Sequence, residues 1–276
     1  MTSKNRLPIV ATIGLCAVTS ASSVAACGDS TACTVESGEY FIALPDEQEG
    51  LLPAFVFIHG FGGTGQGVMR NERLKDAVLS RGYAFVAPAG LMMEGRGGAS
   101  WSFHPERPPR RDEIAFLTEV KNDLTKNQGV DPDRIVLGGF SIGGSMTSYV
   151  ACAAPETFTA YTPLGGSFWR PHPEACAGPV RLLHTHGWSD GTVPLEGRRV
   201  GSGFVQGDVF HAMSIWRETN GCDALKADRF SGASGYWHRI WDACDDNSAL
   251  QLSIFPGGHV IPRGWVDMAL DWYEAL

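Results

Sequence analysis

Short, continuous apolar runs alternate with stretches of helical spacing along this chain. Residues 54–58 (AFVFI) are apolar at every position, which is typical of a strand buried on both faces of a parallel sheet. Residues 112–126 instead combine an acidic first turn with apolar residues at helical spacing. The pattern predicts further strands at 40–44, 83–87, 135–137, 158–164, 179–186 and 250–255, and helices at about 67–80, from 145 to 151 and at about 264–274. Residues 90–111 and 196–212 are expected as loops.

This alternation of strands and helices predicts an α/β fold, with a mostly parallel central sheet covered by helices on both faces. About 250 residues follow an N-terminal leader, which is enough for one large domain with a substantial core. No internal repeat, low-complexity linker or change of composition indicates a second domain. We therefore predict a single domain over residues 27–276.

The leader, residues 1–26, has the features of a secretory signal peptide. Lys4 and Arg6 precede a mostly apolar stretch at 7–17, and small residues follow up to Ala25 and Ala26. The apolar stretch is too short to span a bilayer, and no other segment is long enough. A secreted or periplasmic protein is expected. In an alternative interpretation, residues 24–27 form a lipobox and Cys27 is acylated as a membrane anchor.

Cysteine usage agrees with export. Cys16 belongs to the leader, and six cysteines remain: Cys27, Cys33, Cys152, Cys176, Cys222 and Cys244. An even number in an exported chain favours disulfides over metal ligands or reactive thiols. Six cysteines allow 15 connectivities, and local closure suggests 27–33, 152–176 and 222–244. No C-x-x-C motif or cysteine–histidine cluster has zinc spacing, so we expect no metal.

The charge balance narrows the range of partners. The chain has 30 acidic and 22 basic residues, a formal net charge of −8. An acidic surface disfavours nucleic acid and anionic membranes as partners. A small-molecule, oligomeric or polymeric substrate remains open, and nothing in the sequence indicates the oligomeric state.

One segment has a specific chemical motif. Gly139-Phe-Ser-Ile-Gly143 is a G-x-S-x-G that follows the apolar run at 135–137 and precedes a predicted helix. In that context the serine lies on a strained turn between strand and helix, and the glycines remove side chains that would clash. We predict Ser141 as a nucleophile.

A serine hydroxyl needs a base, and the base needs a group that fixes its tautomer. His259 follows two glycines directly after the last predicted strand, whereas a structural or solvated role is expected for each of the other seven histidines. Asp190 lies on a glycine-flanked turn beyond the strand at 179–186. Its alternative role is an Asx-turn residue that caps this loop. The order Ser141, Asp190, His259 is that of an α/β-hydrolase.

An oxyanion hole requires two backbone N–H donors. Ile142, directly after the nucleophile, should supply one, and we choose Phe61 over Gly62 for the other. Gly60, Gly62 and Gly65 also match the G-x-G-x-x-G dinucleotide fingerprint. The strand that follows ends without the carboxylate that this motif requires, so we expect no nucleotide cofactor.

Three tryptophans fall in loops expected near the carboxyl ends of strands: Trp101, Trp169 and Trp188. Around one site they would suit a flat aromatic or polymeric ester. The alternative for each is that its ring packs a loop onto the core.

Four segments together resemble the exported polyhydroxybutyrate-depolymerase/feruloyl-esterase group of α/β-hydrolases. They are HGFGG at 59–63, GFSIGG at 139–144, HGWSDGTVP at 186–194 and PGGH at 256–259. The resemblance covers nearly the whole chain after the leader. It implies hydrolysis of carboxylic esters through Ser141, Asp190 and His259 without a cofactor. A serine peptidase or amidase could use the same triad, and a non-catalytic binding protein of this fold is the third hypothesis.

Overall fold

The computed structural model describes Met1 and residues 27–201 and 203–276. The predicted signal peptide and most of the lipobox lie outside the described residues. Among the described residues, no helix combines the length and the apolar character needed to cross a bilayer.

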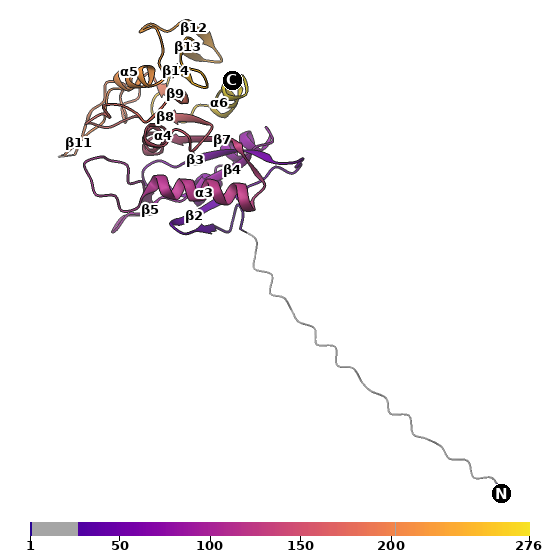
Figure 1. Ribbon diagram of the computed structural model, residues 1–276. Coiled ribbons are helices and arrows are strands. Elements are labelled where there is room, and N and C mark those ends of the chain that lie inside the picture. Colours follow the sequence, from indigo (N-terminus) through magenta and orange to yellow (C-terminus); the bar gives the residue numbers. More distant parts are fainter. Residues whose placement is uncertain (2–26, 202) are drawn as a thin grey trace.

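The centre of the molecule is a ten-stranded sheet, ordered β1-β2-β4-β3-β7-β8-β9-β14-β13-β12. Strands β4, β3, β7, β8, β9 and β14 run parallel, and antiparallel strands extend both edges. Figure 1 shows β2 toward one end of the sheet and β12 and β13 toward the other. The strands are β1 Cys33–Val35, β2 Gly38–Ala43, β3 Leu52–Ile58, β4 Ala84–Pro88, β7 Val130–Phe140, β8 Ala160–Leu164, β9 Arg181–Gly187, β12 Arg229–Ala233, β13 Tyr236–Trp241 and β14 Ala249–Phe255.

Helices cover both faces of the sheet and enclose two apolar clusters. One cluster contains side chains of α3 (Glu113–Asn127), α4 (Ile142–Ala153) and α5 (Val209–Thr219). The other contains side chains of α1 (Gly65–Met69), α2 (Glu72–Leu79) and α6 (Trp265–Glu274). The central strands are therefore buried on both sides, as their continuous apolar runs predict.

Four segments differ from the prediction. The single helix expected at 67–80 was wrong, because α1 ends at Met69 with Arg70 as its C-cap. Asn71 then caps α2 by accepting a hydrogen bond from the Leu74 amide at 3.3 Å. The stretch 196–212, expected as a loop, contains the hairpin β10 (Arg199–Val200) and β11 (Phe204–Val205) and the start of α5. The β12–β13 hairpin was not predicted. A further short pair, β5 (Leu91–Met92) and β6 (Ala99–Ser100), lies within the long loop at 90–111.

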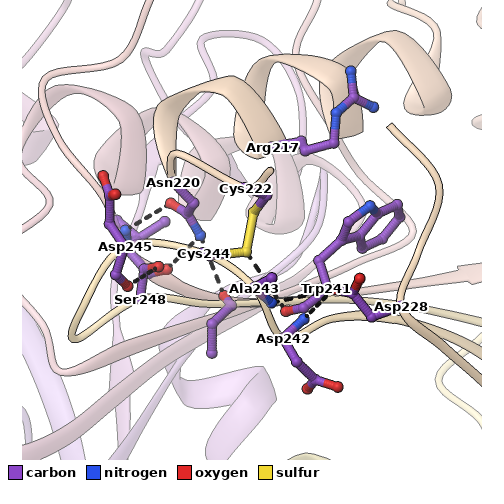
Figure 2. The surroundings of a disulfide bond; sticks show 12 residues. Arg217, Asn220, Cys222, Asp228, Trp241, Asp242, Ala243, Cys244, Asp245 and Ser248 are labelled. Atoms are coloured by element: carbon purple, nitrogen blue, oxygen red, sulfur yellow. Dashed lines mark hydrogen bonds between the residues drawn. A yellow bond between two sulfur atoms is a disulfide. The ribbon is translucent and has the colours of Figure 1, made fainter. Parts of the chain in front are cut away.

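Disulfides join Cys27 to Cys33, Cys152 to Cys176 and Cys222 to Cys244, the three pairs that local closure suggests. Figure 2 shows the third pair, which ties the segment after α5 to the end of β13. Next to it the Asn220 side chain donates to the Val180 carbonyl at 2.8 Å and accepts from the Val180 amide at 2.9 Å. These contacts fix the base of the β12–β13 hairpin to the core.

Candidate active site

Ser141 lies on the sharp turn between β7 and α4. Its backbone has φ 61° and ψ −121°, a region that non-glycine residues rarely adopt. The turn is possible because glycines flank it: a Cβ on Gly143 would lie 2.2 Å from the Ile58 carbonyl oxygen, and one on Gly139 would lie 2.4 Å from the Gly143 oxygen. The Ser141 amide donates to the Leu164 carbonyl at 2.9 Å. The serine is thus held at the carboxyl edge of the sheet, at the amino end of α4.

The three predicted polar residues meet at this edge. His259 Nε2 lies 2.8 Å from Ser141 Oγ, and His259 Nδ1 lies 2.7 Å from Asp190 Oδ2. An ionised carboxylate can only accept, so Nδ1 carries the proton and Nε2 is free to accept from the serine hydroxyl. The Phe140 ring packs against the imidazole with the ring centroids 4.6 Å apart. The arrangement can remove a proton from Ser141 and return it to a leaving group.

Asp190 makes the contacts of both roles considered from the sequence. Its Oδ1 accepts from the amides of Thr192 at 2.9 Å and Val193 at 2.8 Å, which is the Asx-turn interaction. Its Oδ2 faces His259. Burial disfavours the charged form, but the hydrogen bonds from His259 and Val193 outweigh it and hold the pKa of Asp190 below its usual value. The carboxylate is therefore ionised at neutral pH.

Two buried histidines lie behind this turn. His186 Nε2 donates to the Val193 carbonyl at 2.7 Å, which leaves its Nδ1 to accept from His184 Nε2 at 3.1 Å. Burial lowers the pKa of both imidazoles, and a charge on His186 would lower the pKa of His184 further. His186 Nε2 is also 3.6 Å from Asp190 Oδ2. This neutral pair supports the turn that holds Asp190. The sequence shows only two histidines with strand spacing and does not indicate this contact.

The first glycine loop lies beside Ser141, since a Cβ on Gly60 would be 3.3 Å from the Ser141 Cβ. The Gly62 amide is already used, because it donates to the Ala99 carbonyl at 2.9 Å. Among the described residues, no hydrogen-bond acceptor is found for the Phe61 amide. Ile142 is the first residue of α4, so its amide has no acceptor within the helix. Phe61 and Ile142 are therefore the donors that the geometry leaves for an oxyanion.

The predicted tryptophans lie in different environments. Trp101 is 6% exposed and donates to the His59 carbonyl at 3.0 Å, so it supports the first glycine loop from beneath. We do not retain it as a substrate contact. Trp169 is also buried and donates to Ser145 Oγ at 3.2 Å, one turn along α4 from Ser141. Trp188 is 63% exposed on the turn that carries Asp190.

An aromatic wall that the sequence did not indicate joins two loops near Trp169. The Phe204 ring, on the β10–β11 hairpin, lies 4.9 Å from the His104 ring and 5.9 Å from the Trp169 ring, centroid to centroid. The Arg107 guanidinium lies 4.6 Å from the centre of the Phe204 ring. The loops at 90–111 and 199–205 are thereby joined over α4. Phe204 lies in a segment that was expected as a loop, so the sequence did not predict which side chains its ring would contact.

No group of three or more His, Cys, Asp or Glu side chains in the described part of the chain could hold a metal ion.

Comparison with known proteins identifies one family. The sequence model of the phospholipase/carboxylesterase family matches residues 41–206. NocK of Nocardia uniformis subsp. tsuyamanensis, assigned as an esterase, is 30% identical over 186 residues, or 66% of this chain and 51% of NocK. Feruloyl esterase C of Emericella nidulans is 25% identical over 211 residues, or 72% of this chain and 73% of that enzyme. The chain thus spans about half of the first relative and about three quarters of the second.

Solved structures share the fold. The acetyl xylan esterase from Aspergillus awamori superimposes with a TM-score of 0.61 at 19% identity, covering 86% of this chain and 94% of that chain. The Bacillus cereus carboxylesterase has a TM-score of 0.57 at 14% identity, covering 86% and 93%. Together with the sheet topology, these similarities confirm the predicted α/β-hydrolase fold.

Proposed function

The chain belongs to the phospholipase/carboxylesterase family, and from this premise we propose that it hydrolyses carboxylic esters through an acyl-enzyme on Ser141. It is an esterase of the α/β-hydrolase fold. One observation carries the proposed mechanism: Ser141, His259 and Asp190 form a continuous chain of hydrogen bonds of 2.8 and 2.7 Å.

In the proposed reaction the Ser141 hydroxyl attacks the ester carbonyl while His259 Nε2 takes its proton. The carbonyl oxygen becomes an oxyanion, and the Phe61 and Ile142 amides donate to it. His259 then returns the proton to the alcohol oxygen, the C–O bond breaks and the acyl group stays on Ser141. Water repeats the sequence on the acyl-enzyme and releases the acid. Asp190 holds the imidazole in the required tautomer throughout.

For the substrate we propose an ester of an aromatic acid, with a feruloyl ester as the first candidate. The similarity to feruloyl esterase C supports this class. The exposed rings of Phe61 and Trp188 on the two loops that frame the triad also favour a flat acyl group. Hydroxybutyrate oligomers, which the motif resemblance also implies, are the second candidate class of substrate.

We also propose that the protein acts outside the cytoplasm, as one domain over residues 27–276. Three disulfides within a chain of this size support an oxidising compartment. The disulfide at Cys27 uses the thiol that acylation would need, so it favours a soluble exported protein over the lipoprotein.

The test is hydrolysis of p-nitrophenyl butyrate by the Ser141→Ala variant. If the triad acts as a unit, turnover should fall on the order of a million-fold. Ser148→Ala is the matched control, because Ser148 lies on the same helix and its hydroxyl donates to the Gly144 carbonyl at 3.1 Å. Near wild-type turnover by a folded Ser141→Ala protein would reject the mechanism. Amide turnover equal to ester turnover by the wild type would favour a peptidase or amidase.

A further inference from the structure

Most of the exposed aromatic side chains of the described residues lie around one groove. In the described part of the chain, five phenylalanine and tryptophan side chains count as exposed: Phe61, Trp188, Phe210, Phe230 and Trp237. The first lies beside the nucleophile. The other four line a single groove of about 430 Å³. They come from the turn after β9, from α5, from β12 and from β13, so the fold and not the local sequence brings them together.

The groove shares its supporting strands with the proposed active site. Its floor includes Leu252 and Ile254 of β14, the strand that leads to His259. Trp188 forms one wall, two residues before Asp190, and its amide donates to the Phe255 carbonyl at 2.8 Å. The groove therefore begins at the turn that carries the catalytic carboxylate and extends away from it across the edge of the sheet.

The outer wall is held in place by the core. Trp237 pairs with Ile254 in the antiparallel β13–β14 ladder. Below it, His238 Nδ1 lies 2.7 Å from Ser253 Oγ, and the Gln251 side chain lies 2.9 Å from the same hydroxyl. The Cys222–Cys244 disulfide closes the base of this hairpin (Figure 2). The rings are thus presented on a rigid support, which lowers the entropic cost of binding.

The composition of the groove indicates the class of ligand. Aromatic rings make up much of the lining, and Ser231 and Arg239 add polar groups to it. The Arg239 guanidinium lies 5.6 Å from the centre of the Phe230 ring. A sugar ring matches this surface, because it presents an apolar C–H face for stacking and hydroxyl groups at its edge for hydrogen bonding. The net charge of −8 disfavours a polyanion.

We propose that this groove binds a neutral polysaccharide chain and directs an ester carried by that chain to Ser141. The inference rests on the proposed function, for which it names the alcohol side of the substrate. It assigns Phe230 and Trp237 a role in polymer recognition without a role in the chemical step.

The test separates binding from catalysis. Ser141→Ala protein is run through native gels that contain xylan, and its retardation gives a dissociation constant without any turnover. We expect retardation of this protein and at least tenfold weaker binding when Trp237→Ala is added. Leu225→Ala is the control, because Leu225 is 79% exposed in the same disulfide-closed segment but does not line the groove.

In the second arm, Trp237→Ala alone should hydrolyse p-nitrophenyl butyrate at the wild-type rate and feruloylated xylan at least tenfold more slowly. Absence of retardation, or retardation unchanged by Trp237→Ala, would overturn the groove proposal. A wild-type dimer in solution that Trp237→Ala converts to a monomer would also overturn it, because the groove would then be a contact between two copies. If the wild type binds xylan but hydrolyses no ester, the proposed function fails and the groove stands.

Discussion

Replacing Asp190 by asparagine should abolish most activity while leaving the fold unchanged. Oδ1 of Asp190 accepts from the Thr192 and Val193 amides at 2.9 and 2.8 Å, so that position must remain an acceptor. An asparagine will therefore place its oxygen there, and its NH₂ group will take the place of Oδ2, facing His259 Nδ1. Two donors cannot share that contact, so the imidazole must move its proton to Nε2.

The wrong tautomer removes the base. With a proton on Nε2, His259 can donate to Ser141 Oγ but cannot accept from it. The equivalent substitution in serine proteases lowers kcat about 10⁴-fold, which corresponds to about 5 kcal/mol in the activation free energy. We expect a loss of this size for Asp190→Asn on p-nitrophenyl butyrate.

Asp190→Ala is the matched comparison, because it also removes the acceptor of the Thr192 and Val193 amides. The Val193 amide is buried, and a buried amide left without a partner costs about 1–3 kcal/mol. Each kcal/mol lowers Tm by about 2–4 °C in a domain of this size. Thermal unfolding should therefore show a clear loss of Tm for Asp190→Ala and little change for Asp190→Asn. If the folded Asp190→Asn variant hydrolyses p-nitrophenyl butyrate within tenfold of the wild-type rate, the assignment of Asp190 as the group that orients His259 is refuted.

Three further predictions concern the structural support of the site. Gly143→Ala should give little soluble protein, because the new Cβ would lie 2.2 Å from the Ile58 carbonyl, whereas Gly97→Ala, with no atom within 4 Å, should express normally. Replacing both Cys222 and Cys244 by alanine should lower the free energy of unfolding in urea by about 3 kcal/mol and change p-nitrophenyl butyrate turnover less than twofold. A large fall in the turnover of the folded variant would contradict a purely structural role for this disulfide. Because the pKa of His184 is lowered in the folded protein, the unfolded chain binds this proton at a higher pH, and stability should fall as pH drops below about 6.5. The change in Tm between pH 7.5 and 5.5 should therefore be smaller in His184→Gln than in the wild type. An equal change in the two proteins would contradict this reasoning.

The residues of the candidate triad could be chosen from the sequence because each one follows a strand whose pattern is strong. Runs buried on both faces of a sheet contain little besides apolar residues, so the polar residues directly after them are conspicuous. The glycines around Ser141 and His259 then mark the sharp turns. The selection between Phe61 and Gly62 was less secure, and it depends on a tertiary contact with Ala99 that no local pattern shows.

The elements that were missed have weaker or hidden signals. All five residues of β12 are exposed, so the strand has no apolar face to reveal it. Only the two-residue turn at Ser234 and Gly235, both with positive φ, is a hairpin signal that sequence reasoning could have used. Helix α5 buries Val209, Ala212, Met213 and Trp216, a helical spacing that was overlooked within a stretch read as loop.

The backbone of residue 141 limits which amino acids evolution or a protein engineer can place there. At φ 61° a β-branched side chain is strongly disfavoured, so threonine is a poor substitute although it also has a hydroxyl group. Glycine would fit this conformation better than serine does, and a Ser141→Gly protein should be inert yet at least as resistant to unfolding as the wild type. The chain therefore gives up some of its own stability to keep a serine at this position.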